Sequence, residues 1–463
     1  MSVQLIQKPI KKVGTSTTDS KVSNCHQPIL FIFRRQDGTI DSVTNDGGNA
    51  KITTTDDFTL SDIPVGSKVK INSDNYRGIY EVLDSNPPTE FTLDLPFTFD
   101  AIGYVNFYGR ENWYLNIKVD TVTPENESVT AGFLNLREDN DDLIKVNVAP
   151  LLKSYALMND KFNYEDFCFA DNFESNVFYV DYLEKYKSSD LSPISPKESF
   201  WWANSINQPR YRSGSNMEYF MLGNTVGNLI KWLTPFKRPT AWKNFPFCMS
   251  FLNWQLGRYD VFQWENYVGA VTETQVDSEQ NFITRTLLNG LDTSTTDTVD
   301  VKLRTFVEST YYDLSETITV DIDQNCNPNP IYLNWLDTSG GRAFWLFNRI
   351  QTVGLETAVG DVFEPLVEDL ATQQGDIFEV ERQAGNRLVL TAYTTIEKMK
   401  GIKSMLYSLN VLMLVNPDTW QTDGVIWEAV RPLAGSFQLY NTNETHTNLT
   451  VTIELMNTNI QSR

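Results

Sequence analysis

Short runs in which apolar and polar residues alternate recur along the chain, and they constrain its fold more than any other feature. The clearest run is Leu449–Leu455, in which four apolar residues alternate with three polar ones. Similar runs lie at 113–119, 299–303 and 318–322. A period of two is typical of a β-strand that has one face on a core and the other in water. The chain is therefore predicted to be mainly β, with multidomain β-sandwiches.

A compact stretch at about 50–108 interrupts the first group of strand patterns. Its short apolar runs, such as 64–71 and 78–83, are separated by bends at Gly66 and Gly78. Four or five short strands of this kind predict a small β-barrel whose period-two residues fill the middle. Because the flanking strands look like parts of one sheet, the barrel is predicted to be an insertion into the first sandwich.

The rest of the chain is divided by changes in these patterns. A helix is predicted at 395–409, where apolar residues recur at spacings of three and four, although Gly401 weakens it by about 1 kcal/mol relative to alanine. The stretch 188–212 contains three prolines and is predicted to be a surface loop. The predicted segments are an extended N-terminal arm (1–24), a β-sandwich with the inserted small barrel (25–160), a second β-sandwich (161–326) and an α+β C-terminal domain (327–463).

Histidine is scarce, which removes most nucleophilic and metal chemistry. His26 and His446 are the only two histidines in 463 residues, and a nucleophilic triad normally needs a histidine base. Cys25 precedes His26, but neighbours in an extended chain point to opposite faces and cannot form a thiolate–imidazole pair. His446 is expected in an exposed polar turn. No catalytic residue, cofactor site or metal site is predicted.

Acidic residues leave two further possibilities to weigh. A glycoside-cleaving enzyme needs only two carboxylates, but 59 acidic residues provide no pair that stands out. The run Glu138–Asp142 has the oxygen atoms that calcium prefers, but it lacks the order of an EF-hand loop and is predicted to be a solvated acidic turn. Gly340 and Gly341 are predicted to form a hairpin turn and not a phosphate-binding loop.

Charge and cysteine content indicate the surroundings of the protein. The formal net charge of -21 should repel a nucleic-acid backbone. Four widely separated cysteines favour free thiols in a reducing cytosol. The longest apolar stretch, Val411–Val415, is too short for a signal core or a membrane span. The chain is therefore expected to be made in a reducing cytoplasm without membrane insertion.

Two groups of residues are candidates for partner binding. Lys8, Lys11 and Lys12 form a basic cluster that is either a solubilising tail or an assembly arm. Trp201 and Trp202 are adjacent within the predicted loop, where both cannot easily turn inward, so one is expected to contact a partner subunit. The tryptophans expected in the core are Trp232, Trp242, Trp254 and Trp264.

Three stretches resemble structural proteins of tailed phages that infect Bacteroidetes, the crAss-like phages among them. The stretch 329–347, NPIYLNWLDTSGGRAFWLF, resembles a strand–turn–strand pattern of these proteins. The runs at 64–71 and 78–82 are similar to small barrel modules of tail and baseplate proteins, although 62–67 lacks the His-Gly that often precedes the barrel's turn. The end of the chain, 395–455, resembles the terminal part of such tail proteins.

The resemblance implies a non-enzymatic protein of the virion tail, a neck-ring or tail-hub component without cofactors. Such a protein would form a closed homo-oligomeric ring beside other tail or portal-proximal proteins, with heterologous contacts between copies. The lysine-bearing arm would lie across a neighbour, and an acidic channel would let DNA pass without specific binding. The alternative is a carbohydrate- or receptor-binding virion protein that uses Trp201 and Trp202.

Overall fold

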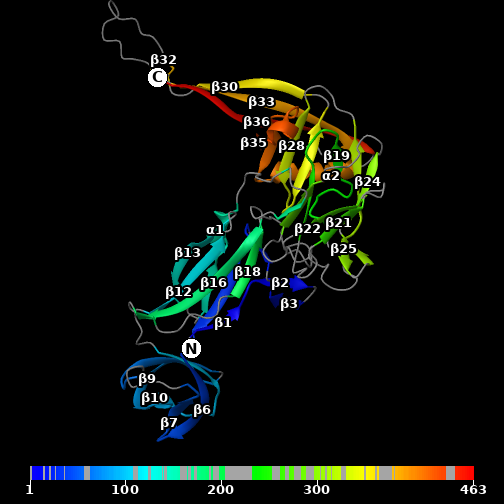
Figure 1. The fold of residues 1–463 in the computed structure, drawn as a ribbon. Coiled ribbons are helices and arrows are strands. Elements are labelled where there is room, and N and C mark those ends of the chain that lie inside the picture. The colour runs from blue at the N-terminus through cyan, green and yellow to red at the C-terminus, as the bar shows by residue number, and fades with distance from the viewer. Residues whose placement is uncertain are drawn as a thin grey trace, which may run out of the picture. The chain divides into compact units, whose positions relative to one another are not determined.

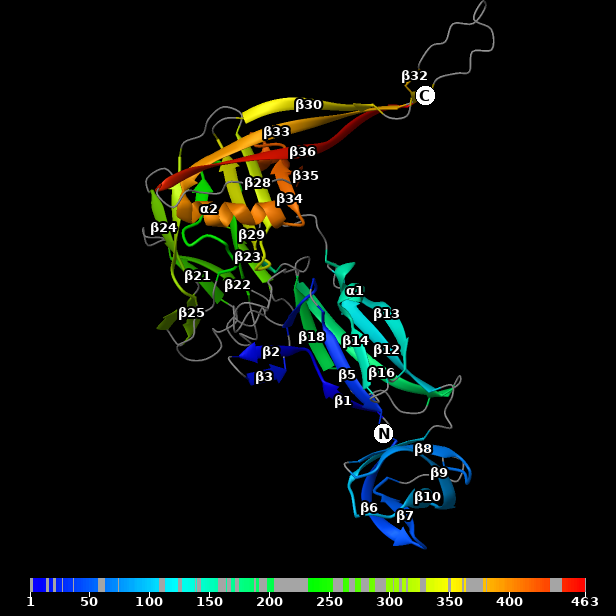
Figure 2. The ribbon, with the colours of Figure 1, turned by 180° about the vertical axis from the view of Figure 1, so that it is seen from behind.

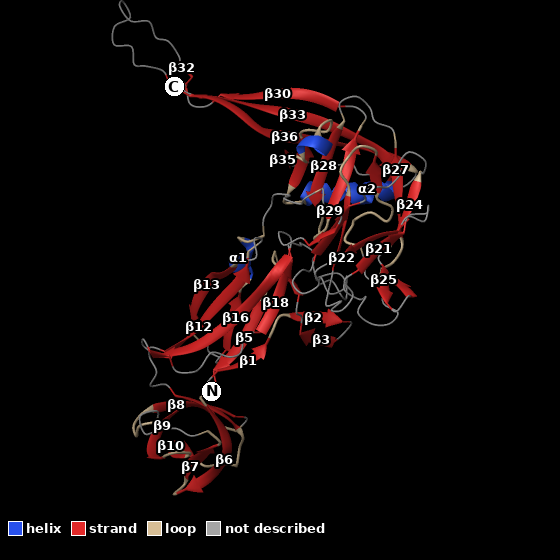
Figure 3. Cartoon of the chain, in the orientation of Figure 1, coloured by secondary structure: helices blue, strands red, loops and turns tan. Residues whose placement is uncertain are grey.

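The computed structural model confirms a mainly β chain with several sheets, a closed barrel and a few short helices (Figure 3). It forms two compact units, Met1–Ser154 with Val177–Trp202 and Tyr155–Asn176 with Ala203–Arg463. The structure describes residues 3–13, 16–19, 22–26, 28–35, 37–56, 63–73, 75–107, 113–123, 127–137, 139, 143–156, 164, 168–170, 175–186, 189–190, 198–203, 232–252, 261–265, 271–275, 283–287, 297–302, 304–307, 310–313, 315–324, 330–348, 351–359, 362–363, 378–379, 381–433 and 444–462.

The first unit contains a β-sandwich. One sheet has the order β1-β5-β14 and the other β13-β12-β16-β18-β4, with β17 paired to β16. Phe31 and Phe33 lie on the same face of β5, toward the second sheet. Their ring centroids lie 5.1 Å from that of Phe200 on β18 and 4.9 Å from that of Tyr182 on β16, respectively. The strands are β1 (Val3–Gln7), β4 (Val22–Asn24), β5 (Leu30–Arg35), β12 (Trp113–Val122), β13 (Ser128–Leu136), β14 (Leu143–Asn147), β16 (Ser175–Tyr186), β17 (Ser189–Asp190) and β18 (Glu198–Ala203), and helix α1 (Ala149–Lys153) follows β14.

Two of the predicted segment boundaries differ from this arrangement. Strands β16 and β18 complete the first sandwich, although 161–326 was predicted to hold a separate one, because β12 pairs with β16 along most of its length. The predicted extended arm, 1–24, is also folded. Its strand β1 pairs with β5, and β2 (Ile10–Val13) forms a hairpin with β3 (Ser16–Asp19).

The predicted barrel exists as a closed six-stranded insertion between β5 and β12, with the order β10-β7-β6-β11-β8-β9 (Figure 1). It begins at Gly38, earlier than the predicted start near 50. Among the described residues, thirteen buried side chains between Ile40 and Val105 form its core, all of them from the barrel itself. The strands are β6 (Gly38–Asp46), β7 (Asn49–Thr54), β8 (Lys68–Ser73), β9 (Arg77–Asn86), β10 (Glu90–Pro96) and β11 (Gly103–Phe107).

The second unit is built on a seven-stranded antiparallel sheet with the order β29-β28-β34-β35-β36-β33-β30. Its three longest members, β30, β33 and β36, run side by side as a curved band (Figures 1 and 2). The predicted hairpin turn is confirmed, since Gly340 joins β28 to β29 with φ of 92°. The strands are β28 (Ile331–Leu336), β29 (Arg342–Phe347), β30 (Gln351–Val359), β33 (Glu381–Thr395), β34 (Val411–Leu414), β35 (Trp427–Pro432) and β36 (His446–Ser462), and β31 (Val362–Phe363) pairs with β32 (Phe378–Glu379).

Smaller sheets complete the second unit. Their orders are β15-β23-β20, β19-β27-β24 and β22-β21-β25-β26. The strands are β15 (Cys168–Ala170), β19 (Thr240–Trp242), β20 (Cys248–Leu252), β21 (Val261–Glu265), β22 (Val271–Gln275), β23 (Ile283–Leu287), β24 (Thr298–Val301), β25 (Arg304–Val307), β26 (Thr310–Asp313) and β27 (Ile318–Asp323).

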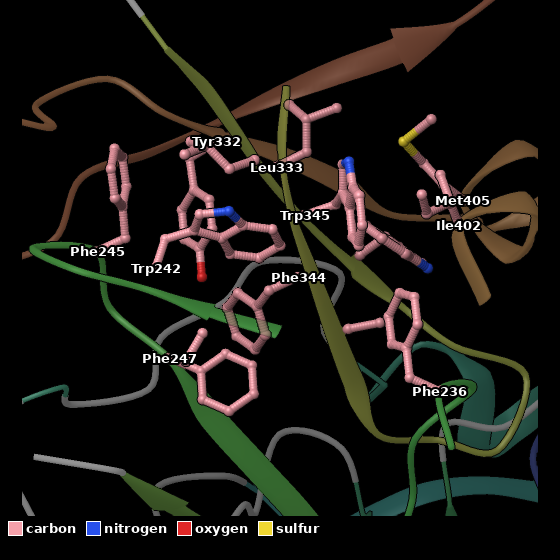
Figure 4. Packing of buried hydrophobic residues seen from close by; sticks show 14 of the residues in the cluster. Phe236, Trp242, Phe245, Phe247, Tyr332, Leu333, Phe344, Trp345, Ile402 and Met405 are labelled. Carbon is pink, nitrogen blue, oxygen red and sulfur yellow. The ribbon is translucent and has the colours of Figure 1, made fainter. Parts of the chain in front are cut away.

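One hydrophobic core joins residues on both sides of the predicted boundary at 326. It runs from Tyr164 through Trp242 to Ile453. Figure 4 shows Trp242 and Phe245 around the Tyr332 ring. The centroids of the Trp242 and Phe245 rings lie 5.9 and 4.9 Å from the centroid of the Tyr332 ring. The structure therefore gives a single core where two domains were predicted.

The predicted helix at 395–409 is confirmed in its position but consists of two pieces. Helix α2 (Ile396–Ile402) continues as the 3-10 helix η2 (Lys403–Tyr407), and a further short helix, α3 (Trp420–Asp423), follows β34. Thr395 caps α2 by accepting a hydrogen bond from the Lys398 backbone N–H. A Cβ at Gly401 would lie 2.3 Å from the Phe236 ring, so this glycine allows the ring to pack against the helix.

Candidate assembly surfaces

The tryptophan pair lies on strand β18 and not in a loop. Strand alternation separates the two side chains, so that Trp202 is fully buried and Trp201 is half-buried. The Trp202 indole N–H donates to Thr121 Oγ1 at 3.2 Å, and Thr121 in turn donates to the Val177 carbonyl at 2.8 Å. Trp202 is therefore a core residue, which corrects its assignment to partner binding. Partner binding through Trp201 remains a prediction.

The three lysines lie at the start of the chain. Lys8 is half-buried and follows β1. Lys11 and Lys12 lie on β2, opposite Thr18 and Thr17 of β3, and their side chains lie outside the described residues. The structure thus places two of the lysines on a short hairpin, and their role in assembly remains a prediction.

The other residues that the sequence singled out are structural where they are described. Asp139 accepts from the Leu143 backbone N–H and pairs with Lys145, both at 2.9 Å. It therefore closes the predicted acidic turn, while Glu138 and 140–142 lie outside the described residues. Cys25 is buried, and His26 is half-buried in the same turn.

Other sequence predictions fall beyond the described side chains. Trp232 and Trp242 are buried as expected, whereas Trp254 lies outside the described residues and only the backbone of Trp264 is described. The prolines of the predicted loop at 188–212 are also outside them, although strand β18 lies within that stretch.

Arg342 is the centre of a buried polar cluster in the second unit. Its Nη1 donates to Asn334 Oδ1 at 3.2 Å and to Asn410 Oδ1. These bonds tie β28 and β29 to the residue before β34. A cavity of about 10 Å³ beside Arg342 has room for roughly one water molecule. This cluster therefore stabilises the sheet and is too closed to hold a substrate.

The barrel presents a rigid apolar loop that the sequence did not single out. Phe99 and Ile102, between β10 and β11, are 65% and 76% exposed. The Tyr76 hydroxyl donates to the Phe99 carbonyl at 2.7 Å and accepts from the Thr98 and Phe99 backbone N–H groups. The Asp100 carboxylate accepts from the Val43 backbone N–H at 2.7 Å. These bonds fix the loop in a conformation in which two large apolar side chains are exposed to water.

Strand β30 presents a second apolar surface, on the edge of the seven-stranded sheet. Val353 and Leu355 are 73% and 68% exposed. Val353 stands opposite Leu388 of β33, and residues directly opposite each other share a face. Leu388 is only 7% exposed, so the apolar face of the sheet is buried at β33 and exposed at β30. The alternation of Val353 and Leu355 was the available sequence signal.

The opposite face of the same sheet is polar. The Tyr393 ring stacks on His446 at 5.5 Å between centroids, and Tyr393 is 44% exposed. Thr391 lies two residues along and its hydroxyl is 3.2 Å from that of Thr450. His446 is exposed as predicted, but it begins strand β36 and does not lie in a turn.

The described part of the chain lacks two further features. No helix there has the length and apolar character needed to cross a membrane. Histidine, cysteine, aspartate and glutamate side chains in these residues form no group of three that could hold a metal ion.

Comparisons with known proteins establish no family for this chain. No family model matches it, and no curated protein matches it. Among solved structures, the full extracellular region of plexin A4 matches 91% of this chain at 7% identity, with a TM-score of 0.16. The chain spans 53% of the length of that structure. A similarity of this size carries no argument about function.

Proposed function

We propose that this protein is a non-enzymatic structural component of the tail of a tailed phage, in a neck ring or tail hub. The observation that carries the proposal is the architecture, which combines a sandwich, a closed barrel with a core of its own, and a seven-stranded sheet that shares one core with smaller sheets. Close-packed β layers resist deformation, which suits a part that must transmit force between neighbours. The three sequence stretches that resemble tail proteins support the same role.

Exposed apolar side chains on rigid supports are the second line of support. Hydrogen bonds of the Tyr76 hydroxyl and the Asp100 carboxylate fix the loop that carries the exposed Phe99 and Ile102. Ordered apolar anchors lose little conformational entropy on binding, and such residues dominate protein interfaces. In the proposed ring, the loop at 97–102 contacts a neighbouring copy or another tail protein.

Electron microscopy and native mass spectrometry of the purified full chain test the proposal. Closed rings with a fixed number of copies are expected, together with stoichiometric amounts of the protein in purified phage particles. The double variant Phe99→Ser/Ile102→Ser should weaken assembly, with Val65→Ser as a control at another exposed apolar position of the barrel. A protein absent from particles, or one that hydrolyses a host polysaccharide, contradicts the proposal.

A carbohydrate- or receptor-binding virion protein is the second candidate. Burial of Trp202 removes one of the two side chains on which that hypothesis depended. The observation that favours it is the exposed Tyr393, stacked on His446 beside threonine hydroxyls, since sugar rings stack on aromatic faces while their hydroxyls form hydrogen bonds. Glycan-array binding by the wild type that is lost in Tyr393→Ala would favour this candidate over the ring.

A further inference from the structure

We infer that the edge strand β30 is a self-association site, at which a second copy of this chain pairs antiparallel with its own β30. The inference starts from the backbone. Strand β30 is the last strand of the seven-stranded sheet and pairs with β33 alone among the described strands. Its outer side therefore carries amide and carbonyl groups that can pair with a further strand.

The strand lacks the usual protection against such pairing. Natural edge strands are blunted by short length, bulges, prolines or charges. Strand β30 has nine residues and pairs with β33 without a register shift. Its first half, 351–355, contains neither a charged residue nor a proline. The two apolar side chains there, Val353 and Leu355, are among the most exposed of the described chain.

A second copy is the occupant because each copy offers one open edge of this sheet. The opposite edge strand, β29, is buried at all six of its residues. A sheet with a single open edge closes when that edge meets its own copy, and a two-fold contact of this kind satisfies both edges at once.

The sequence of β30 is also complementary to itself. With the two-fold axis at Gly354, Val353 stands opposite Leu355 of the second copy, and this apolar pair occurs twice. The only charged residue of the strand, Glu356, then occupies the position opposite Thr352 of the second copy. The two acidic positions do not face each other, although each chain carries a formal net charge of -21. Cross-strand pairs of apolar residues stabilise a sheet, whereas directly opposed like charges destabilise it.

Sedimentation of the full chain over about 1 to 100 µM gives the first test. The wild type should dimerise. Val353→Lys/Leu355→Lys should raise the dissociation constant at least about 100-fold, which is two tenfold steps for two substitutions. The control Val65→Lys/Ile79→Lys makes the same charge change at exposed apolar positions of the barrel and should leave the dimer unchanged, with folding checked by circular dichroism.

Crosslinking gives a second test that does not depend on a destabilising substitution. Gly354→Cys places a thiol on the axis, and a Cβ there meets only the Arg387 carbonyl, at 3.9 Å. Disulfides require Cβ atoms about 3.5–4.5 Å apart. Under mild oxidation Gly354→Cys should form covalent dimers beyond the wild-type background. Thr352→Cys, two positions from the axis on the same face, should not.

Three results would overturn the inference. They are a monomeric wild type across the concentration range, a dimer that tolerates both lysines, and equal crosslinking of the two cysteine variants. If another protein supplied the pairing strand, the purified wild type would be monomeric, which is the first of these results. The inference does not rest on a role in a virion. Rings are detected by microscopy, whereas the β30 dimer is detected by the effect of the β30 substitutions.

Discussion

At the scale of single residues, close approach decides what the sequence pattern alone cannot. Gly401 in helix α2 was predicted to be a weak point, because glycine is a poor helix former. The structure gives the reason for the glycine, since the Phe236 ring occupies the space of a Cβ. The low helix propensity of Gly401 is therefore tolerated, because a larger residue would collide with the Phe236 ring.

Gly401→Ala is therefore expected to lower stability, although alanine normally favours a helix by about 1 kcal/mol. Overpacking against Phe236 should cost about 1–3 kcal/mol, so the net sign is destabilising. Urea unfolding followed by tryptophan fluorescence measures the change. Gly401→Ala with Phe236→Leu should recover part of the loss, and the exposed Lys400→Ala serves as the control in the same helix. A more stable Gly401→Ala protein would contradict the expectation.

Thr121 links two partners in the core of the first sandwich. Thr121→Val keeps the shape but removes the acceptor of the Trp202 indole N–H and the hydrogen bond from Thr121 to the Val177 carbonyl. A buried group without its partner costs about 1–3 kcal/mol, so faster hydrogen exchange is expected in β12 and β18. Thr44→Val, at an exposed position of the barrel strand β6, serves as the control. Unchanged exchange in β12 and β18 would show that the hydroxyl contributes nothing.

Tyr332 makes the second unit sensitive to alkali. Burial raises the pKa of Tyr332 well above its usual value, and the nearby Cys248 adds to the shift. Because the pKa of Tyr332 is higher in the folded protein than in the unfolded chain, the unfolded chain loses this proton at a lower pH. The free energy of unfolding is therefore unaffected below about pH 10 and falls as the pH rises further. The loss approaches about 1.4 kcal/mol per pH unit.

Tyr332→Phe removes this dependence. It also removes the 2.7 Å hydrogen bond to the Pro246 carbonyl, so at neutral pH the variant should be about 1 kcal/mol less stable. The difference between wild type and variant should shrink above about pH 10 in urea titrations. A difference that stays constant through pH 11 would show that burial does not oppose ionisation at this site.

At the scale of elements, the barrel and the long strands differ in how far they depend on their surroundings. The described core of the barrel contains only residues of the barrel itself, whereas Val353 and Leu355 of β30 are exposed. The barrel is therefore expected to fold alone, and β30 is expected to gain from a partner.

The excised barrel, 38–107, should unfold cooperatively as an isolated domain of about 70 residues, a length at which many domains fold alone. Circular dichroism and dispersed amide NMR signals would check this. Ile52→Ala, at a fully buried position, should lower its stability by about 2–5 kcal/mol. The exposed Ile79→Ala is the matched control. An unfolded excised segment would mean that the barrel needs the sandwich.

At the scale of the whole molecule, the sequence predicted local structure better than partnership. The mainly β class, the inserted barrel, the helix near 395 and the turn at Gly340 all follow from short-range patterns. Which strands share a sheet does not. Strand β12 pairs with β16, about sixty residues later, because sheet partners are selected by packing and not by order in the chain.

The candidate surfaces show the same limit. Nearby prolines suggested a loop around the tryptophan pair, but the alternation of Phe200 and Trp202 on β18 already indicated a strand with one buried face. Val353 is exposed although its cross-strand partner Leu388 is buried, a difference that no local pattern encodes. The sequence could therefore locate apolar strands but not tell which of them remain open to water.

The junction between the barrel and the sandwich has a consequence for how such a chain can change. Gly38, where the barrel starts, pairs with Val105 close to its end, and the Asp37 backbone N–H donates to the same Val105 carbonyl at 3.0 Å. The two ends of the barrel segment therefore lie next to each other where they join the sandwich. Deletion of the barrel, or its replacement by another domain whose ends lie close together, should leave the sandwich folded. This junction is therefore a suitable position for inserting a foreign domain.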